Sequence, residues 1–328
     1  MSDLLQVKNL YTRFHTEDGV VPAVNGISFN LKRGESLGIV GESGCGKSVA
    51  CLSIMRLIGP PGQVEAETML LDGTDLLSLS EKKMRSIRGN DMAFIFQEPM
   101  TSLNPVYTIG FQLQEAIRLH QGLNKKQSQN KSIEMLKLVG IPRAEKVFNE
   151  YPHSLSGGMR QRAMIAMALS CEPKILFADE PTTALDVTIQ AQILDLMQDL
   201  KNRLNTSIVF ISHDLGVISE MVDRVIVMYC GMIVEDTAIR TLVKNPKHPY
   251  TVGLINSKPQ LYVEVDKLVP ISGNVPNPLN MPKGCPYHPR CNDVMDICRK
   301  EIPKREAITE DHHVRCWLFS EQGGKINS

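Results

Sequence analysis

Gly41-Glu42-Ser43-Gly44-Cys45-Gly46-Lys47-Ser48 is the stretch of sequence that decides the fold. It fits the pattern G-x-x-x-x-G-K-[ST], the P-loop, in which glycines let backbone N–H groups come close to a phosphate. Lys47 supplies a positive charge for the outer phosphates, and the hydroxyl of Ser48 can bind Mg²⁺. The sequence therefore predicts a loop that binds a nucleoside triphosphate together with Mg²⁺.

The segments around this loop have the patterns that a phosphate-binding loop requires. Residues 36–40 form a short apolar run typical of a buried strand, and residues 49–57 suit a helix whose N-terminus faces the phosphate. Residues 4–31 alternate in patches, with glycines between them, and predict a small antiparallel sheet. Phe14 lies in a polar stretch there, so it either stacks on an adenine ring or is a half-buried strand residue.

The composition is that of a globular protein with two or three domains: the chain has 328 residues, of which 42% are hydrophobic. Equal numbers of basic and acidic residues, 36 each, argue against a general nucleic-acid coat. The N-terminus lacks the basic start and apolar core of a signal peptide, and the longest apolar run, near residues 225–234, is about half a membrane span. We therefore expect a soluble or peripheral protein that uses cytosolic nucleotide.

Two apolar runs end in side chains that can act on a phosphate, at positions where strands of an α/β sheet carry ligands. Residues 175–178 precede Asp179, which suits a Mg²⁺ partner through water, and Glu180, which is placed to polarise an attacking water. Residues 207–212 precede His213. A lone histidine is usually structural, but at such a strand end a contact with the γ-phosphate is the better interpretation.

Two further features lie between the P-loop and the acid pair. Gln97 follows the apolar run 93–96, and its amide could reach a metal or a water. Residues 108–170 show helical periodicity, and within them Leu155-Ser156-Gly157-Gly158-Met159 opens a helix with Ser156 as the N-cap. The N–H groups at this helix N-terminus predict a second anion site, although an ordinary N-cap would have the same sequence.

Four of the eight cysteines gather in a proline-rich C-terminal segment: Cys285, Cys291, Cys298 and Cys316, spaced C-x₅-C-x₆-C-x₁₇-C. In a reducing compartment such a cluster indicates a metal site rather than disulfides. A segment with little hydrophobic core of its own also needs a cross-link, such as a bound metal, to be stable. Four thiolates fit zinc or a [4Fe–4S] cluster, but the close C-x₂-C pairs usual for structural zinc are absent. The residues alone leave the cluster, zinc and free thiols open.

Taken in order, these motifs resemble those of the ATP-binding subunits of ABC transporters. The resemblance covers nearly the whole chain and depends most on the Ser-Gly-Gly signature between the P-loop and the acid pair. It implies an α/β fold: a P-loop NTPase (RecA-like) core sheet, an antiparallel β subdomain, an α-helical signature subdomain and an irregular Cys-rich extension. The implied domains are a nucleotide-binding domain over residues 1–240, with its helical subdomain at about residues 101–165, and an extension over residues 241–328.

The resemblance also implies roles for individual residues. Each ATP is expected to lie between the P-loop of one subunit and Ser156, Gly157 and Gly158 of the other subunit. The roles within one subunit are adenine stacking by Phe14, Mg²⁺ binding by Ser48, Gln97 and Asp179, catalytic base for Glu180, and γ-phosphate contact for His213. Asp186 also matches the family pattern, and no catalytic position departs from it.

The C-terminal part resembles the peptide-importer branch of this family. The matching segments are residues 246–251 (PKHPYT), residues 284–291 (GCPYHPRC) and residues 97–105 (QEPMTSLNP). The branch implies an ATPase on the cytoplasmic face of the inner membrane, bound peripherally, that energises import of di- or oligopeptides. Its implied partners are a paralogous ATPase subunit in a heterodimer, two membrane permease subunits and an external solute-binding protein, with no nucleic acid. It also favours a [4Fe–4S] cluster over zinc at the four cysteines.

Other functions remain open at this point. Nickel and other small-solute importers share the same features. A non-transport ABC ATPase acting on DNA or ribosomes would usually carry a coiled-coil insertion or two cassettes, whereas this chain has one P-loop, one signature and no sustained heptads. An iron–sulfur redox enzyme would need a substrate pocket, for which the sequence gives no signal. An exporter would normally contain membrane helices fused to the ATPase, and none is found in this sequence.

Overall fold

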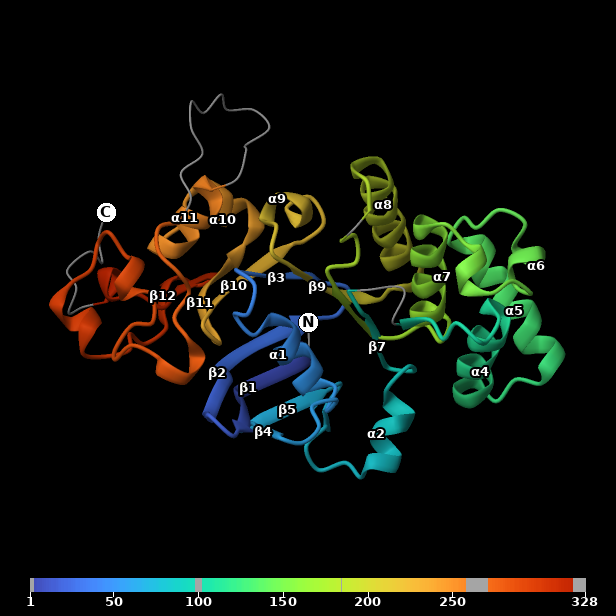
Figure 1. Cartoon of the computed structure of the whole chain (residues 1–328), viewed down its shortest axis with the longest axis horizontal. Coiled ribbons are helices and arrows are strands. Elements are labelled where there is room, and N and C mark those ends of the chain that lie inside the picture. Colours follow the sequence, from blue (N-terminus) through green and yellow to red (C-terminus); the bar gives the residue numbers. More distant parts are fainter. Residues whose placement is uncertain (1–2, 98–101, 184, 258–270, 321–328) are drawn as a thin grey trace. The chain divides into compact units, whose positions relative to one another are not determined.

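The computed structural model of the chain describes residues 3–97, 102–183, 185–257 and 271–320. These residues form two compact units, whose elements are labelled in Figure 1. The first unit consists mainly of residues 78–210, and the second of residues 3–31, 36–77 and 211 onward.

Short parallel strands form the sheet of the first unit. β7 (Met92–Ile95) pairs in parallel with β8 (Ile175–Asp179), with Ile95 opposite Ala178. Every residue of β8 is buried, as expected for an apolar strand covered on both faces. Because the two strands are parallel, their carboxyl ends lie at the same edge of the sheet.

Helices make up most of the first unit, and those between α4 and α7 appear in green in Figure 1. The periodicity of residues 108–170 predicted them, and the breaks fall at Gly122 and Gly140, which adopt φ angles of 64° and 73°. Thr108, Asn124 and Ser156 cap the helices that follow them, each accepting a backbone N–H. The elements are α2 (Glu81–Ile87), α4 (Ile109–Gln121), α5 (Lys125–Leu138), α6 (Ala144–Val147), η1 (Pro152–Ser154), α7 (Gly157–Leu169), α8 (Val187–Leu204) and β9 (Ser207–Ser212).

An antiparallel sheet begins the second unit, as the sequence predicted for residues 4–31. Its strand order is β2-β1-β5-β6, and β4 also pairs with β1. Inward-facing residues of β1 such as Leu5, Val7 and Leu10 are at most 2% exposed, so one side of the strand is core. The strands are β1 (Asp3–Thr16), β2 (Gly19–Lys32), β4 (Gly62–Glu65), β5 (Thr68–Leu71) and β6 (Thr74–Asp75).

A second sheet of this unit carries the P-loop. β3 (Ser36–Val40) is buried throughout and pairs in parallel with β10 (Arg224–Tyr229), while β10 forms the expected hairpin with β11 (Met232–Ala238). The P-loop follows β3 and leads into α1 (Lys47–Ile54). Three more helices lie in this unit: α9 (Leu215–Ile218), α10 (Ile239–Lys244) and α11 (Pro249–Asn256).

The C-terminal extension is more regular than the sequence suggested. β13 (His312–Val314) pairs antiparallel with β11, and β12 (Glu306–Thr309) pairs with β13, so the extension adds two strands to the edge of this sheet. Short 3₁₀ helices make up much of the rest: η2 (Pro278–Asn280), η3 (His288–Arg290), η4 (Asp296–Arg299) and η5 (Trp317–Phe319). The domain boundary near residue 240 stays a prediction, because β11 in the nucleotide-binding part and the extension belong to one compact unit.

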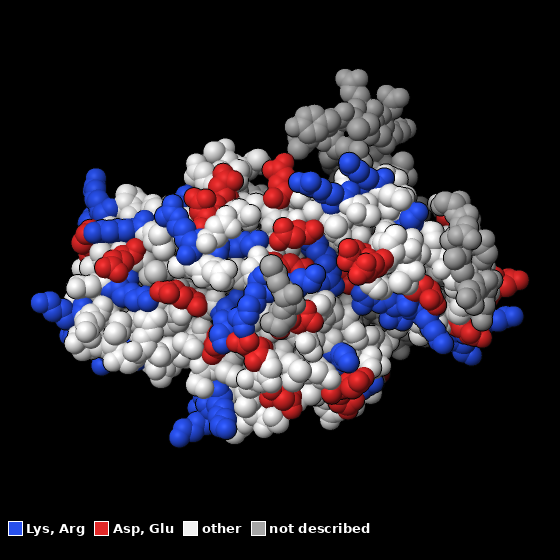
Figure 2. Space-filling view, turned by 180° about the vertical axis from the view of Figure 1, so that it is seen from behind, with Lys and Arg blue, Asp and Glu red and all other residues white. Residues whose placement is uncertain are grey.

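The surface carries both signs of charge. Figure 2 shows Lys and Arg interspersed with Asp and Glu on one face, in keeping with 36 residues of each sign. Among the residues that the structure describes, no helix is both long enough and apolar enough to cross a membrane.

Buried ionisable groups hold the extension to β11. Glu235 is fully buried and accepts backbone N–H groups of Lys247 and His248 at 2.7 and 2.9 Å, and its Oε1 lies 2.8 Å from His312 Nε2. Burial opposes ionisation of Glu235, but these hydrogen bonds outweigh it and lower its pKa. Burial also lowers the pKa of His248 to about 4, against the opposing effect of the Glu235 charge.

We predict that acid destabilises the second unit through His248. The unfolded chain binds a proton at His248 below its ordinary pKa of 6.5, whereas the folded chain does so only below about 4. Stability should therefore fall as the pH drops from 6.5 to 4, by about 3 kcal/mol from this residue.

His248→Asn provides the matched variant, because an asparagine can still accept the N–H of Tyr250 at the start of α11, as the imidazole does at 3.0 Å. Thermal unfolding measured between pH 7 and 4.5 should show a smaller loss of stability in this variant than in the wild type. An equal loss in both proteins would show that His248 is not the group responsible.

Candidate nucleotide-binding site

The backbone of the P-loop depends on glycine at two positions. Gly41 and Gly46 have φ angles of 154° and 96°, in the region that favours glycine. A Cβ on Gly41 would collide with the carbonyl of Met228, and one on Gly46 with the carbonyl of Ala23. These close approaches explain why the loop following β3 needs glycines at both ends.

Lys47 lies inside the loop rather than in solvent. Its side chain is buried, and its Nζ donates hydrogen bonds to the carbonyls of Gly41 at 2.8 Å and Glu42 at 3.0 Å. No described side chain caps α1, so the N–H groups of its first turn can bind an anion. Ser48, in that turn, is half-buried. The arrangement places a fixed positive charge and backbone donors where a phosphate can bind.

The loop is held from outside by residues that sequence reasoning did not single out. Glu42 donates its backbone N–H to the hydroxyl of Tyr250 at 2.8 Å, and its carboxylate pairs with Arg290 at 2.7 Å. The N–H of Gly231 donates to the carbonyl of Cys45 at 3.0 Å. The only sequence signal for Tyr250 and Arg290 was their place in the two C-terminal segments that resemble peptide importers.

In the first unit, Gln97 and Glu180 meet at the edge where β7 and β8 end. Gln97 Nε2 donates to Glu180 Oε2 at 2.7 Å, and Thr183 Oγ1 donates to the same oxygen at 3.0 Å. Glu180 has a φ of 45°, an uncommon backbone for a residue with a side chain, while Asp179 just before it is buried. The sequence predicted the polar strand ends, but gave no signal for Thr183.

The Ser-Gly-Gly turn opens α7 in the same unit. The exposed Ser156 caps the helix, its Oγ accepting the N–H of Met159 at 3.4 Å. The buried Gln161 of α7 donates to the carbonyl of Pro181, just after the acid pair. This hydrogen bond ties the signature helix to the turn that carries Glu180.

Phe14 and His213 are the remaining residues that the sequence predicted for the site. Phe14 is half-buried on β1, opposite Gly62 of β4, and His213 is exposed directly after β9. Both belong to the second unit with the P-loop, whereas Gln97, Ser156–Gly158, Asp179 and Glu180 belong to the first. Their roles stay predictions, and residues 98–101 of the segment that begins at Gln97 lie outside the described part of the chain.

The four clustered cysteines are half-buried or buried, and they influence one another electrostatically. Burial, together with a smaller effect of the neighbouring cysteines, raises the pKa of Cys285 to about 11 and that of Cys316 to about 12. The Cys285 N–H donates to the Cys298 carbonyl at 2.8 Å. Over the described ranges, however, no three His, Cys, Asp or Glu side chains form a group that could hold a metal ion. The structure therefore does not support the predicted cluster or zinc site.

Comparison with known proteins identifies the class. The ABC transporter family matches residues 24–183, the part that runs from β2 through the P-loop to the turn after the acid pair. The structure is similar to that of the ATP-binding cassette MJ0796 in a dimeric post-hydrolysis state bound to ADP and phosphate, with a TM-score of 0.64 and 27% identity over 72% of this chain and 99% of that one. It is also similar to cbiO1 from Clostridium perfringens, with a TM-score of 0.62, 26% identity and coverage of 75% and 92%. The chain is an ABC-type ATPase, for which ATP and Mg²⁺ are the expected ligands.

The branch of the family follows from the rest of the chain. Residues 234–298 match the C-terminal region of oligopeptide/dipeptide transporters. The chain is 51% identical to the oligopeptide transport ATP-binding protein AppD of Bacillus subtilis, over 99% of each protein. It is 48% identical to OppD of Haemophilus influenzae, over 98% and 99%, and 48% identical to DppD of Bacillus subtilis, over 98% and 96%. The chain belongs to the family of oligopeptide and dipeptide ABC transporter ATP-binding proteins, as its motifs predicted.

Proposed function

We propose that this chain hydrolyses ATP to ADP and phosphate in order to energise an ABC importer of di- or oligopeptides. The observation that carries the proposal is the match of residues 234–298 to the C-terminal region of oligopeptide/dipeptide transporters, in a chain with an ATPase P-loop. Relatives named as oligopeptide and dipeptide transport ATP-binding proteins support it along almost the full length.

Nucleotide binding is assigned to the P-loop. The loop N–H groups and Lys47 bind the phosphates, and Phe14 stacks on the adenine. Ser48, Gln97 and Asp179 offer hydroxyl, amide and carboxylate oxygens, the donor type that Mg²⁺ prefers, so they would hold the ion. Bound Mg²⁺ would neutralise the charge that develops on the phosphates.

Water activation is assigned to Glu180. The hydrogen bonds from Gln97 and Thr183 both end on its Oε2 and hold the carboxylate at the edge where β7 and β8 end, where it would orient the attacking water. The uncommon backbone at Glu180 supports this assignment, since strained residues cluster at active sites. His213 is assigned the contact with the γ-phosphate.

We predict that Glu180→Gln binds MgATP with wild-type affinity but lowers hydrolysis by at least about 100-fold, because an amide cannot accept the proton of the water. The measurement is ATP turnover in liposomes that contain the chain with its membrane subunits and binding protein. Wild-type turnover should rise with added peptide.

Glu172→Gln is the matched control, because Glu172 is exposed and pairs with Lys131 elsewhere in the same unit. It should leave turnover unchanged. Wild-type turnover in Glu180→Gln would remove Glu180 as the base, and stimulation by nickel instead of peptide would contradict the proposed substrate.

The proposed partners follow from the family. The chain works at the cytoplasmic face of the inner membrane, bound peripherally to two permease subunits, and an external binding protein delivers the solute. A paralogous ATPase subunit completes a heterodimer, in which Ser156, Gly157 and Gly158 contact the nucleotide on the partner. The exposed position of the Ser156 cap supports such a contact, because its helix N-terminus is accessible to a second molecule.

We predict that Ser156→Arg leaves MgATP binding to the isolated chain intact but slows turnover of the assembled transporter on the order of 100-fold, because it removes a donor to the phosphate of the partner subunit. Nucleotide titration of the chain and turnover of the complex measure the two effects separately. Unchanged turnover would rule out the shared site.

For the four C-terminal cysteines we propose a [4Fe–4S] cluster, with zinc as the alternative. The donor chemistry supports it: Cys291 and Cys298 raise the pKa of Cys285, the other three cysteines raise the pKa of Cys316, and a bound cation would reverse that repulsion. Ligation by Cys285, Cys291, Cys298 and Cys316 would staple a segment made mainly of short 3₁₀ helices.

We predict that protein purified without oxygen contains about four irons and four acid-labile sulfides per chain, with visible absorbance. Cys298→Ser should lose most of the iron, while Cys171→Ser, at a buried cysteine of the first unit, should retain it. Stoichiometric zinc without iron would favour the alternative, and protein without either metal would contradict both.

A further inference from the structure

Arg290 of the C-terminal extension reaches the P-loop with a nearly completely buried side chain. It lies in η3, and only 3% of the side chain is exposed. Its Nη1 and Nη2 donate to the two carboxylate oxygens of Glu42 at 2.7 and 3.0 Å, which is the two-pronged geometry of a strong ion pair. Its Nε donates to the carbonyl of Ser272 at 3.0 Å, so the guanidinium is fixed from both sides.

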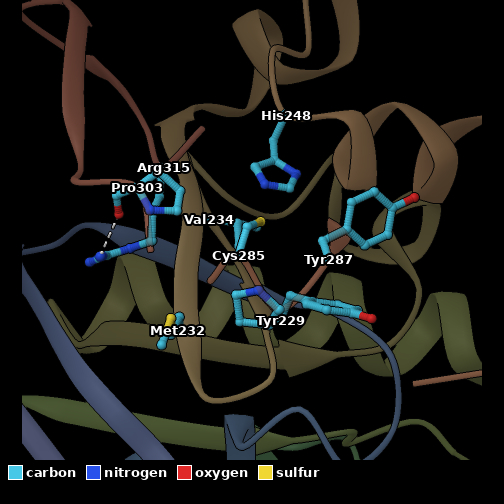
Figure 3. Close-up of a pocket in the computed structure, with 9 residues that line it drawn as sticks. Tyr229, Met232, Val234, His248, Cys285, Tyr287, Pro303 and Arg315 are labelled. Carbon is cyan, nitrogen blue, oxygen red and sulfur yellow. Dashed lines mark hydrogen bonds between the residues drawn. The ribbon is translucent and has the colours of Figure 1, made fainter. Parts of the chain in front are cut away.

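Aromatic rings surround this ion pair. The ring centres of Tyr229, Tyr250 and Tyr287 lie 4.7 to 5.4 Å from one another, and the Arg290 guanidinium lies 5.8 Å from the Tyr229 ring and 6.0 Å from the Tyr287 ring. Figure 3 shows Tyr229 and Tyr287 among the residues that line a pocket, together with Cys285. The guanidinium of Arg290 is therefore poorly hydrated, which strengthens its interaction with the partly exposed Glu42 carboxylate.

Glu42 is an unfavourable residue for a phosphate site unless its charge is compensated. It is the second residue of the P-loop, and its carbonyl accepts a hydrogen bond from Lys47 Nζ at 3.0 Å. A free carboxylate there would repel an incoming phosphate and compete for the Lys47 ammonium. The pairing with Arg290 compensates the charge of this carboxylate, while the hydroxyl of Tyr250 accepts the Glu42 N–H.

We infer that Arg290 is a positioning residue for ATP binding: it neutralises and fixes Glu42, so the C-terminal extension sets the affinity of the P-loop for nucleotide. The inference rests on the proposed binding of ATP by this loop. It assigns the extension a function in the ATP site besides any metal or membrane contact.

The test compares MgATP affinity, by calorimetric titration of the full chain, with thermal unfolding of the same proteins. Arg290→Gln should weaken MgATP binding about tenfold, because Glu42 is then uncompensated. Glu42→Gln in the Arg290→Gln background should restore most of the affinity, since it removes the repelling charge. A role of Arg290 in folding alone would not be rescued in this way.

Arg305→Ala is the control for a weakened extension. Arg305 also pairs with a buried carboxylate, that of Asp236 on β11, but makes no described contact with the P-loop. It should reduce thermal stability and leave MgATP affinity at the wild-type value. Equal affinities of Arg290→Gln and Arg305→Ala, or absence of rescue by Glu42→Gln, would overturn the inference.

Two further variants keep the test decisive. If Arg290→Gln does not fold, Arg290→Lys keeps the charge but loses the two-pronged contact, so it should bind MgATP about threefold more weakly than the wild type. Wild-type affinity in Arg290→Lys would also overturn the inference. Lys47→Ala separates the positioning role of Arg290 from the proposed binding of ATP by the P-loop. If the wild type did not bind MgATP, or if Lys47→Ala bound it as well as the wild type, the ATP site itself would be contradicted.

Discussion

The ion pair between Arg290 and Glu42 is the constraint on which the second unit most depends. It joins a residue of the phosphate loop to a residue of the C-terminal extension, and its two parallel hydrogen bonds leave little freedom to either side chain. Burying the Arg290 charge is costly unless it is fully paired, and here Ser272 and Tyr229 complete the hydrogen bonds of the guanidinium. The C-terminal extension is thus part of the structure that surrounds the P-loop.

The reactive groups are divided between the two units. The second unit contains the charge and the N–H groups that are proposed to bind phosphate, around Lys47. The first supplies the carboxylate that would orient water, with Glu180 held by Gln97 and Thr183, and α7 tied to the same turn through Gln161.

Local patterns predicted most of this arrangement. The strand–loop–helix around the P-loop and the polar ends of β7 and β8 could be read directly, because each depends on residues close together in sequence. Arg290 could not, since its partner lies 248 residues away and an arginine in a proline-rich segment is ordinary by composition. β12 and β13 were not predicted for a related reason. They are only four and three residues long, and they form strands because the edge of β11 is available for pairing. The four cysteines were found, but their spacing does not fix whether a metal binds.

Amide hydrogen exchange of the P-loop tests most directly whether the extension holds the loop. Full-length wild-type protein and Arg290→Lys would be compared without nucleotide, following the peptide that covers residues 41–48. The account predicts faster exchange in this peptide in the variant, because a lysine cannot form the two-pronged contact with Glu42, and unchanged exchange in β10 and β11. Equal protection of residues 41–48 in the two proteins would contradict the claim that Arg290 fixes the loop.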